Sequence, residues 1–504
     1  MPTLSLEKVL TTLQKENLLK EYIVDNQWQF APNMAPDLTV AKLAYDSREV
    51  QSETLFFCKG FNFEEKYLVQ AVENGAAIYL AETTYENIDA IGVIVTDIRQ
   101  AMAKISQLFY DFPEKKLTTV AITGTKGKTT TSFFAHGVLD AAFPGKVGLS
   151  STESICLDGK NFEKAHLSTP ESLDLFAMLA KALSNGLTHF VIEVSSQAYK
   201  LDRVFGMTFD YGIFLNISTD HISPTEHPTF DDYFYWKRQL LVHCQTLILN
   251  HDSDFYPLIL QTAQHSAKNI YTFGFSSEAD LQVIPQKKAT EFQLIARKNA
   301  LAEATGTYAL HFPGDFNFAN AAAALTVASL LKVPRTLTGP ALEKITVPGR
   351  MMVFHKKNGG VIFVDYAHNY TSLENMVTYL QHTYPGFEIG LLIGAPGDRA
   401  FSRRGDFGRI ITKYMDVAIL TEEDSTKGDV REINNDIKKE IQKELPLYEL
   451  LDRTDAVWKA CELTGPTTAM IIAGKGTERT QRRLEGTLDY EGDDAIVERY
   501  LTQE

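Results

Sequence analysis

Residues 120–134, VAITGTKGKTTTSFF, constrain the fold more than any other part of this 504-residue chain. An apolar run that predicts a buried strand leads into a glycine-rich loop, and a helical pattern follows. Backbone N–H groups of such a loop close on phosphate oxygens, Lys128 can reach the β- and γ-phosphates, and the Thr129 hydroxyl can ligate Mg²⁺. A strict phosphate loop has a glycine where this chain has Ile122, so the loop is two residues shorter. The residues expected to bind ATP here are Gly124, Thr125, Lys126, Gly127, Lys128, Thr129 and Thr130.

Further apolar runs predict that the whole chain is built from α/β units. Three of these runs precede the loop: TLFFC, AIYLA and GVIV. Three follow it: THFVIEV, YGIFLNI and TLILN. The last four are GVIFVDY, IGLLIG, VAILT and AMIIAG. Strands that alternate with helical patterns indicate parallel, doubly wound sheets, which hold ligands at the carboxyl ends of their strands. Turns at residues 111–114 and 347–350 indicate three domains, residues 1–113, 114–346 and 347–504.

Composition excludes several classes of protein. Asp and Glu number 64 against 49 Lys and Arg, and the net charge of −15 disfavours non-specific binding to nucleic acid or anionic membranes. Four scattered cysteines predict buried thiols in a reducing cytoplasm. Leu6, Val9, Leu10 and Leu13 recur at helical spacing, which indicates an amphipathic helix and not a signal peptide. We therefore expect a cytoplasmic protein with no nucleic-acid partner and no membrane insertion. As a separate expectation, we take it to be a monomer.

Polar side chains follow several of the apolar runs. Glu193 ends HFVIE, where a nucleotide-binding fold places a second acid that holds Mg²⁺, although a solvated glutamate has the same pattern. His221 follows another strand end, and a lone histidine is often structural. Lys237 lies in the aromatic-rich segment YFYWKR, where a lysine commonly extends its ammonium to water. The asparagines of FPGDFNFAN, residues 312–320, can read a base or cap the Ala-rich helix that follows.

Taken together, these motifs closely resemble those of the Mur ligases, the ATP-dependent amide ligases of bacterial peptidoglycan synthesis and cell-wall biogenesis. GTxGKT, EVSS, NxxxDH, GxFNxxN, PGR and DYAH occur in the family's order between residues 117 and 370. DSR at residues 46–48 and GKGTE at 474–478 extend the resemblance and are similar to the members that add a diamino acid. The resemblance implies a UDP-sugar domain, a central P-loop domain with a parallel sheet, and a Rossmann-like domain for the amino acid.

The reaction that the resemblance implies starts with ATP phosphorylating the free D-Glu carboxylate of UDP-N-acetylmuramoyl-L-Ala-D-Glu. The amine of a diamino acid then attacks the acyl phosphate and expels phosphate. Two anions meet in the first step, so Lys128 and two Mg²⁺ ions would screen them. The implied catalytic residues are Lys128, Glu193, His221 and Lys237. The implied metal ligands are Thr129, Glu193, His221 and Lys237, with Lys237 carbamylated so that it becomes an anion.

The resemblance also implies residues that bind the two larger substrates. Further contacts to ATP are expected from Asn216, Asn317, Arg350 and Asp365. The UDP-peptide is expected to bind Ser47, Ser168, Thr169, Ser195, Arg203 and Lys237. Ser47 has a second interpretation as a plain turn residue, because no helix is obvious after it. The family usually has x-Pro after DYAH, whereas this chain has Asn369-Tyr370, so that loop is expected to sit differently while Asp365 and His368 are kept.

Specificity for the incoming amino acid is expected at the strand ends of the last domain. Arg399 matches the arginine that grips the amino acid's carboxylate. Family members that add meso-diaminopimelate have Asp-Asn-Pro-Arg where this chain has residues 423–426, so Thr426 stands where their arginine would be. Extra acids without that arginine favour a distal ammonium, and L-lysine is the expected substrate. The residues expected to bind it are Arg399, Glu423, Asp424, Ser425, Thr426, Gly474 and Glu478.

Three alternatives stay open from the sequence. L-ornithine is one methylene shorter than lysine, and a pocket discriminates a methylene by only about 1–3 kcal/mol. A sister ligase such as folylpolyglutamate synthase has the same core, although DSR and GKGTE argue against it. A non-catalytic nucleotide-binding homologue is the third alternative, but Lys128, Glu193, His221 and Lys237 are all present.

Overall fold

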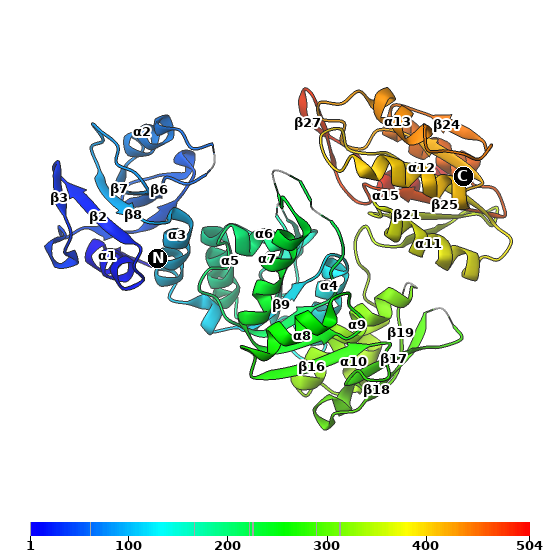
Figure 1. Ribbon diagram of the computed structural model, residues 1–504, viewed down its shortest axis with the longest axis horizontal. Helices are drawn as coiled ribbons and strands as arrows, with labels where there is room; N and C mark the ends of the chain where they lie inside the picture. Colours follow the sequence, from blue (N-terminus) through cyan, green and yellow to red (C-terminus); the bar gives the residue numbers. More distant parts are fainter. Residues whose placement is uncertain are drawn as a thin grey trace. The chain divides into compact units, whose positions relative to one another are not determined.

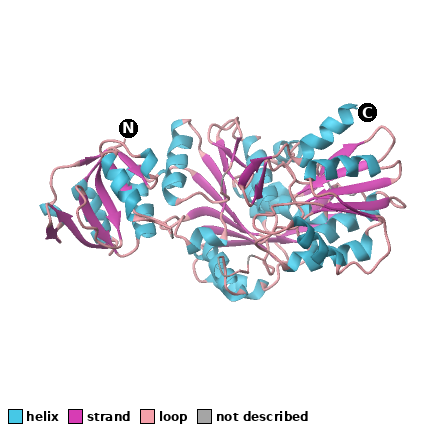
Figure 2. Ribbon diagram, turned by 90° about the horizontal axis from the view of Figure 1, so that it is seen from above, coloured by secondary structure: helices cyan, strands magenta, loops and turns pink. Residues whose placement is uncertain are grey.

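The computed structural model describes residues 2–60, 62–165, 167–220, 222–223, 226–288, 290–311 and 314–503. The chain divides into two compact units, which are described separately. The first comprises Met1–Ser218, Asp231–Phe273 and Ala323–Val333, and the second comprises Thr219–Phe230, Gly274–Ala322 and Pro334–Glu504. Strands and helices alternate along the chain (Figure 1), and helices pack on the faces of the main sheets (Figure 2). The predicted α/β fold class is confirmed.

The N-terminal sheet of the first unit has six strands, of which four neighbouring ones are parallel to one another. Its strands are β2 (Leu19–Val24), β3 (Gln27–Gln29), β5 (Lys42–Ala44), β6 (Thr54–Phe57), β7 (Ala76–Ala81) and β8 (Ile91–Val95). The order is β3-β2-β8-β7-β6-β5, with β5 to β8 parallel and β2 and β3 antiparallel to their neighbours. The short strands β1 (Leu4–Ser5) and β4 (Thr39–Val40) form a separate pair. The helices are α1 (Leu6–Lys15), α2 (Glu65–Glu73) and α3 (Ile98–Phe109).

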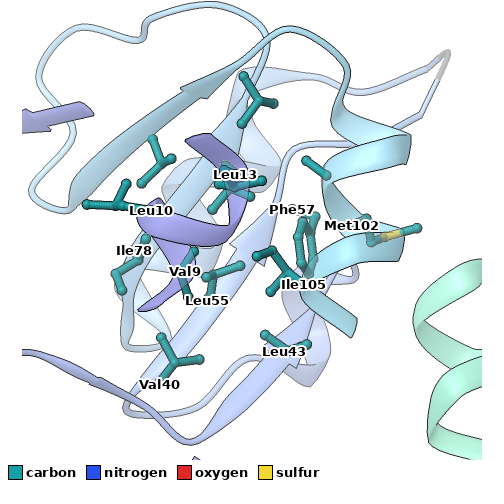
Figure 3. Close-up of a cluster of buried hydrophobic side chains, with 14 of the residues drawn as sticks. Val9, Leu10, Leu13, Val40, Leu43, Leu55, Phe57, Ile78, Met102 and Ile105 are labelled. Carbon is teal, nitrogen blue, oxygen red and sulfur yellow. The ribbon is translucent and has the colours of Figure 1, made fainter. Parts of the chain in front are cut away.

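The apolar stripe at the N-terminus forms the core that the sequence predicts. The Ser5 hydroxyl accepts a hydrogen bond from the Lys8 N–H and so caps α1. Four apolar residues of α1 are fully buried. Figure 3 shows α1 side chains in one cluster with residues of β6 and α3, among them Phe57 and Ile105. The buried stripe of α1 is Leu6, Val9, Leu10 and Leu13.

The central sheet of the first unit is parallel over most of its width. Its strands are β9 (Thr118–Thr123), β10 (Val147–Ser150), β11 (Ser154–Cys156), β12 (Glu163–Lys164), β13 (His189–Glu193), β14 (Phe209–Phe214), β15 (Cys244–Asn250) and β16 (Asn269–Gly274). They follow the order β12-β11-β10-β13-β9-β14-β15-β16. β11 and β12 are antiparallel additions that the sequence did not predict, and β12 is short and exposed. The helices are α4 (Lys128–Asp140), α5 (Ser172–Ser184), α6 (Ser196–Lys200), α7 (Phe230–Val242) and α8 (Tyr256–Gln264).

The second unit contains three antiparallel strands and the C-terminal sheet. β17 (Leu281–Pro285), β18 (Glu291–Ala296) and β19 (Gly306–Ala309) are antiparallel. The predicted Ala-rich helix is α9 (Asp315–Leu330), and α10 (Arg335–Leu342) follows it. Phe292 of β18 stacks on Phe318 of α9 with ring centroids 4.8 Å apart, which holds the first turns of the helix against these strands.

The C-terminal sheet is Rossmann-like, as the resemblance implied. Its strands are β20 (Met352–His355), β21 (Val361–Asp365), β22 (Glu388–Ile393), β23 (Val417–Leu420), β24 (Leu447–Glu449) and β25 (Thr468–Ala473). The order is β20-β21-β25-β22-β23-β24, and all pairs are parallel except β20 with β21. The helices are α11 (Tyr370–Thr383), α12 (Ser402–Tyr414), α13 (Val430–Lys438), α14 (Arg453–Leu463) and α15 (Asp493–Gln503). A hairpin of β26 (Thr480–Arg483) and β27 (Gly486–Asp489) lies between β25 and α15 in the sequence.

Ile433, Ile437, Ile441 and Leu445 recur every four residues, a pattern that predicts a longer helix than α13. Ile433 and Ile437 are buried, but the helix ends at Lys438, so Ile441 and Leu445 do not extend the stripe. Leu445 precedes Pro446, and a residue before proline is disfavoured in the α conformation.

All four cysteines are buried free thiols, as expected. Among the described residues, no helix is long and apolar enough to cross a membrane.

Candidate active site

The glycine-rich loop turns from β9 into α4 as the motif predicts. Gly127 has φ +84° and precedes Lys128, the first residue of the helix. A side chain is strained in this left-handed conformation, so the glycine permits the turn. Thr129 and Thr130 are buried in the first turn of α4. The loop therefore presents backbone N–H groups and a helix N-terminus on one edge of the central sheet.

Two lysines donate to a single carbonyl oxygen of this loop. Lys128 Nζ lies 2.8 Å from the Gly124 oxygen, and Lys237 Nζ lies 2.9 Å from the same oxygen. Lys237 is only 2% exposed and sits 4.8 Å from the centre of the Tyr233 ring. The Tyr233 hydroxyl shares a 3.0 Å hydrogen bond with Thr125. The structure thus brings Lys237 to the phosphate loop and does not extend it to water.

Asn216 holds the loop from the neighbouring strand. Its side-chain oxygen accepts from the Lys126 N–H at 2.9 Å, and its amide nitrogen donates to the Lys126 carbonyl at 3.0 Å. The Asn216 carbonyl also accepts from the Thr125 N–H at 3.0 Å. In this structure Asn216 positions the loop, and its contact with ATP stays a prediction. The predicted catalytic residue His221 lies outside the described residues.

The predicted UDP-peptide residues of the central domain form one hydrogen-bonded cluster. Glu193 ends β13, which pairs with β9 beside the phosphate loop. The Thr169 hydroxyl donates to the Glu193 carbonyl at 2.8 Å and accepts from the Ser195 N–H at 3.1 Å. The Arg203 guanidinium donates to the Thr169 carbonyl at 3.1 Å. Hydroxyl and guanidinium groups therefore gather at the strand end next to the loop.

The Glu193 carboxylate is held by a residue that the sequence did not single out. Thr152 donates to it through its N–H at 2.9 Å and through its hydroxyl at 3.0 Å. The Thr152 hydroxyl also shares a 2.7 Å hydrogen bond with the predicted substrate residue Ser168. Glu193 is fully buried, so it is not the solvated strand-end glutamate of the alternative interpretation.

Ser47 lies in the N-terminal part of the first unit. It begins a single 3₁₀ turn, Ser47–Glu49, which Asp46 caps by accepting from the Arg48 N–H. Ser47 is buried, and its hydroxyl donates to Gln70 at 2.8 Å. The missing helix after DSR is thus a 3₁₀ turn, too short to show an apolar period.

The remaining predicted ATP residues lie in the second unit. Asn317 is buried near the start of α9, where its side-chain oxygen accepts from Asn320 at 3.4 Å. Asp365 ends β21 and accepts from the N–H groups of Met351 and Ala367 at 2.7 and 2.6 Å. Burial raises the pKa of Asp365, and the nearby Arg350 opposes that shift. The contacts of these residues with ATP stay predictions.

Asn369-Tyr370, which follows DYAH in place of the family's x-Pro, starts a helix. Asn369 is the N-cap of α11 and accepts from the Ser372 N–H at 3.0 Å. Asparagine is among the strongest N-cap residues, so it starts this helix where the family usually has x-Pro. His368 is partly buried, with Nδ1 2.7 Å from the Tyr366 carbonyl, and desolvation lowers its pKa to about 3.

Two of the three acids in the loop after β23, residues 422–424, are paired with basic side chains. Glu422 pairs with Arg483 at 2.6 Å. Asp424 pairs with Lys475 and with Arg482, each at 2.9 Å. The cations that neutralise these acids come from the segment around the β26–β27 hairpin, and not from Lys427 beside them. These ion pairs offset the negative charges of Glu422 and Asp424.

Glu423 is the exception in this loop. Its side chain is buried, and its Oε2 atom has no hydrogen-bond partner among the described residues. That oxygen faces the backbone of Gly474, where a Cβ would lie 3.5 Å from it. Burial raises the pKa of Glu423 to about 7, and the nearby Arg453 and Lys475 oppose the shift. An incoming cation that reached Glu423 would supply the missing partner.

The other predicted amino-acid residues surround Asp424. Arg399 is half exposed and lies 3.6 Å from the Asp424 carboxylate, beyond hydrogen-bond distance. Thr426 has φ +47°, and its N–H donates to the Arg482 carbonyl at 3.0 Å. The Ser425 hydroxyl donates to Glu422 at 2.6 Å, and Lys475 also pairs with Glu478 at 2.5 Å. Arg399 is thus a loosely held cation at the strand end.

Comparison with known proteins identifies the family. Residues 122–328 match the Mur ligase middle domain, and residues 349–476 match the Mur ligase glutamate ligase domain. The chain belongs to the Mur ligase family. It is 44% identical over 515 residues to the UDP-N-acetylmuramoyl-L-alanyl-D-glutamate–L-lysine ligase of Enterococcus faecalis, covering 99% of both chains. It is 40% identical over 500 residues to the ligase of the same name from Streptococcus mutans, covering 99% of this chain and all of the relative.

Solved structures of Mur ligases share the fold along the whole chain. A UDP-N-acetylmuramoyl-L-alanyl-D-glutamate–2,6-diaminopimelate ligase matches with a TM-score of 0.66 and 22% identity, covering 99% of both chains. MurF from Acinetobacter baumannii matches with a TM-score of 0.65 and 18% identity, covering 100% of this chain and 99% of that one. The three-domain Mur ligase architecture expected from the motifs is confirmed.

Several residues of this Mur ligase site escape sequence reasoning. Arg453 is fully buried, pairs with Asp493 at 2.7 Å, and donates to the carbonyls of Glu422 and Ala473 at 3.1 and 2.7 Å. It therefore ties together the ends of β23 and β25, which carry Glu423 and Gly474. No motif marks Arg453, because its role depends on strands that are distant in sequence. Lys475, in contrast, lies inside the GKGTE motif and could have been singled out.

The oxygen donors near the phosphate loop suit Mg²⁺. Mg²⁺ prefers carboxylate, hydroxyl and water oxygens. Glu193 offers a carboxylate at the end of β13, and Thr129 offers a hydroxyl in the first turn of α4. The described residues contain no ready-made group of three or more His, Cys, Asp or Glu ligands. A carbamate on Lys237 would add a further oxygen donor beside the loop.

Proposed function

We propose that this Mur ligase uses ATP to join L-lysine to the D-Glu carboxylate of UDP-N-acetylmuramoyl-L-Ala-D-Glu in peptidoglycan synthesis. The observation that carries the proposal is the adjacency of the phosphate loop and the hydroxyl–guanidinium cluster on β9 and β13. The relatives at 40–44% identity, whose names specify L-lysine, support the choice of amino acid.

The first step forms an acyl phosphate. A D-Glu carboxylate oxygen attacks the γ-phosphorus of ATP, a new P–O bond forms, and the bond to the β-phosphate oxygen breaks to release ADP. Lys128 and the N–H groups of the loop stabilise the charge on the transferring phosphoryl group. Arg203, Thr169 and Ser195 hold the peptide, so that its carboxylate meets the phosphate in line.

The second step forms the amide. The α-amino nitrogen of lysine attacks the acyl carbon, the C–O bond to phosphate breaks, and inorganic phosphate leaves as the nitrogen loses a proton. Arg399 moves away from Asp424 and binds the α-carboxylate of lysine. Glu423 receives the distal ammonium, because its Oε2 is buried and has no hydrogen-bond partner in the described part of the chain.

Lys237 acts as a carbamate in this proposal. Lys128 and Lys237 bring two amine groups to the same Gly124 carbonyl, so a carbamate on Lys237 would place an anion beside the amine of Lys128. The neutral amine of Lys237 would add CO₂ with formation of a C–N bond, and loss of one proton from the nitrogen leaves an anionic carbamate. Glu193, Thr129, His221 and this carbamate would hold Mg²⁺. When bound, Mg²⁺ supplies positive charge that stabilises the transferring phosphoryl group.

The amino acid is tested by phosphate release with saturating ATP and UDP-N-acetylmuramoyl-L-Ala-D-Glu. We expect L-lysine to give the highest kcat/KM and meso-diaminopimelate to be at least about 100-fold poorer, because its second carboxylate meets Glu423 without a dedicated arginine. L-ornithine is one methylene shorter and should be about 10- to 200-fold poorer. Equal or better use of meso-diaminopimelate would contradict the specificity.

The same assay separates the alternatives. A folylpolyglutamate synthase would release no phosphate with the UDP-peptide but would do so with a folate and glutamate. A non-catalytic homologue would release none with either pair. Preferential use of ornithine would keep the reaction and change only the amino acid.

A further inference from the structure

Three cationic side chains converge on the carboxylate of Glu171 in the first unit. Lys59 Nζ lies 2.7 Å from this carboxylate, Arg203 lies 2.9 Å from it, and Arg99 lies 3.4 Å from it. Glu171 is the N-cap of α5, whereas Lys59, which is 112 residues away in the sequence, comes just after β6. Arg203 is already a candidate for binding the UDP-peptide, but Lys59 and Glu171 are not.

We propose that Lys59 is a further substrate-binding residue, which with Arg203 holds an anionic group of the UDP-peptide. The group is either the diphosphate or a carboxylate of that substrate. Glu171 is a positioning residue that keeps the two cations side by side. This inference rests on the proposed function, since it names a contact within the site for the same substrate.

The position of Lys59 joins the two separate parts of the predicted UDP-peptide site. β6 is parallel to β5, and the segment after β5 contains Ser47. Lys59 Nζ lies 4.0 Å from the ring centre of Tyr45, two residues before Ser47. On the other side, Arg203 reaches the Thr169 carbonyl at 3.1 Å. A substrate held by both Ser47 and Thr169 must therefore pass this group of cations.

The charges around Lys59 leave room for another anion. Burial lowers the pKa of Lys59 even though Glu171 is 2.7 Å away, so the environment compensates its charge incompletely. Glu171 is shared with Arg203 and Arg99. The second nearby acid, Asp174, accepts from the Tyr45 hydroxyl at 2.6 Å, and burial raises its pKa. Arg99 also faces Asp202, which leaves Lys59 and Arg203 as the cations for a ligand.

Access to this group is narrow but present. The side chains of Lys59, Glu171 and Arg203 retain 8, 13 and 13% exposure. An anion that reached them would form charge-assisted hydrogen bonds in a largely desolvated setting, where such bonds are strong. A purely structural ion pair between the N-terminal and central sheets is the competing explanation, and it predicts a loss of stability without a loss of substrate affinity.

The test compares Lys59→Met and Lys59→Gln with the parent enzyme and with Lys66→Met. Lys66 is an exposed lysine of α2, paired with Glu64, and serves as the matched control. We expect both Lys59 variants to raise the KM for the UDP-peptide by about 10- to 100-fold, the loss of one charge-assisted hydrogen bond. The KM for lysine and the kcat should change less than about twofold, and Lys66→Met should match the parent. Isothermal titration of the UDP-peptide should show the same loss of affinity.

Competitive inhibition by UDP separates the two anionic groups. If Lys59 holds the diphosphate, the variants should lose affinity for UDP as well, whereas a carboxylate contact leaves UDP inhibition unchanged. Lys59→Arg retains the charge and should stay within about fivefold of the parent, which keeps the test valid if the neutral variants do not fold. An unchanged KM for the UDP-peptide in a folded neutral variant, or a Lys59→Arg variant that loses 10-fold or more, would overturn the inference. Absence of phosphate release by the parent would instead count against the proposed function.

Discussion

Replacing Glu423 by glutamine tests whether this carboxylate recognises the distal ammonium of lysine. Its buried Oε2 has no partner among the described residues, whereas Glu422 and Asp424 on either side are paired with arginines. A hydrogen bond to a charged group contributes about 1.5–3 kcal/mol. We therefore expect Glu423→Gln to lower kcat/KM for lysine by about 10- to 150-fold at pH 8.5, with little effect on the KM for ATP.

The pKa of about 7 for Glu423 makes this effect depend on pH. The carboxyl group is protonated below pH 6 and ionised above pH 8, and kcat/KM reports the ionisation of the free enzyme. The ratio of parent to variant kcat/KM should therefore rise from near one below pH 6 to its full value above pH 8. Taking the ratio cancels the ionisation of the lysine α-amine, which is common to both enzymes.

The free energy of unfolding of the parent should fall over the pH range in which the parent-to-variant ratio of kcat/KM rises. The pKa of Glu423 rises from its ordinary value of 4.5 to about 7 on folding, so between these values the folded state binds more protons than the unfolded state. The free energy of unfolding therefore falls as pH rises through this window, by about 3 kcal/mol in total. Glu423→Gln should remove that loss and be more stable than the parent at pH 8.

The assay is phosphate release between pH 5.5 and 9, with denaturation midpoints measured over the same range. Glu422→Gln is the matched control, because its carboxylate is already occupied by Arg483 and Ser425. It should change lysine use less than about threefold, with no dependence on pH near 7. A parent-to-variant ratio for Glu423→Gln that stays constant with pH, or parent-like use of lysine, would refute the reasoning.

Three further variants test other parts of the site. Lys128→Ala should lower kcat by about 10²- to 10³-fold, because it removes a charge that stabilises the transferring phosphoryl group, and near-normal turnover would remove the phosphate-loop assignment. Lys237→Ala should be inactive and partly rescued by acetate or another small carboxylate, and parent-like activity without additive would rule out the carbamate. Arg453→Met should cost about 3–5 kcal/mol of stability, because it leaves Asp493 buried without its partner, and a denaturation midpoint equal to that of the parent would contradict this.

The sequence alone predicts the phosphate loop, the parallel strands and the N-terminal helix. These features depend on residues that are close together in the chain. Gly127 permits the left-handed turn into α4, and Leu6, Val9, Leu10 and Leu13 recur at the helical period that buries one face. The sequence predicts the ends of helices and strands less accurately than their presence. Helix α13 ends at Lys438, although the apolar repeat continues to Ile441 and Leu445.

The motifs also predict which residues gather around the loop. Glu193, Thr169, Ser195 and Arg203 form one hydrogen-bonded group, because the carboxyl ends of parallel strands meet at a common edge. Lys237 was ambiguous, since a lysine among aromatic residues can extend to water or turn inward. Only its placement 2.9 Å from the Gly124 carbonyl decides between the two.

Tertiary structure decides the charge that each side chain presents to a ligand. The sequence shows Glu422, Glu423 and Asp424 as one acidic run, yet cations 51 to 61 residues further along the chain pair with the outer two. Oε2 of Glu423 has no hydrogen-bond partner within the residues that the structure describes. Lys59 and Glu171 form an ion pair although they are 112 residues apart in the sequence. Coulomb energy depends on separation in space and on burial, and neither quantity follows from spacing along the chain.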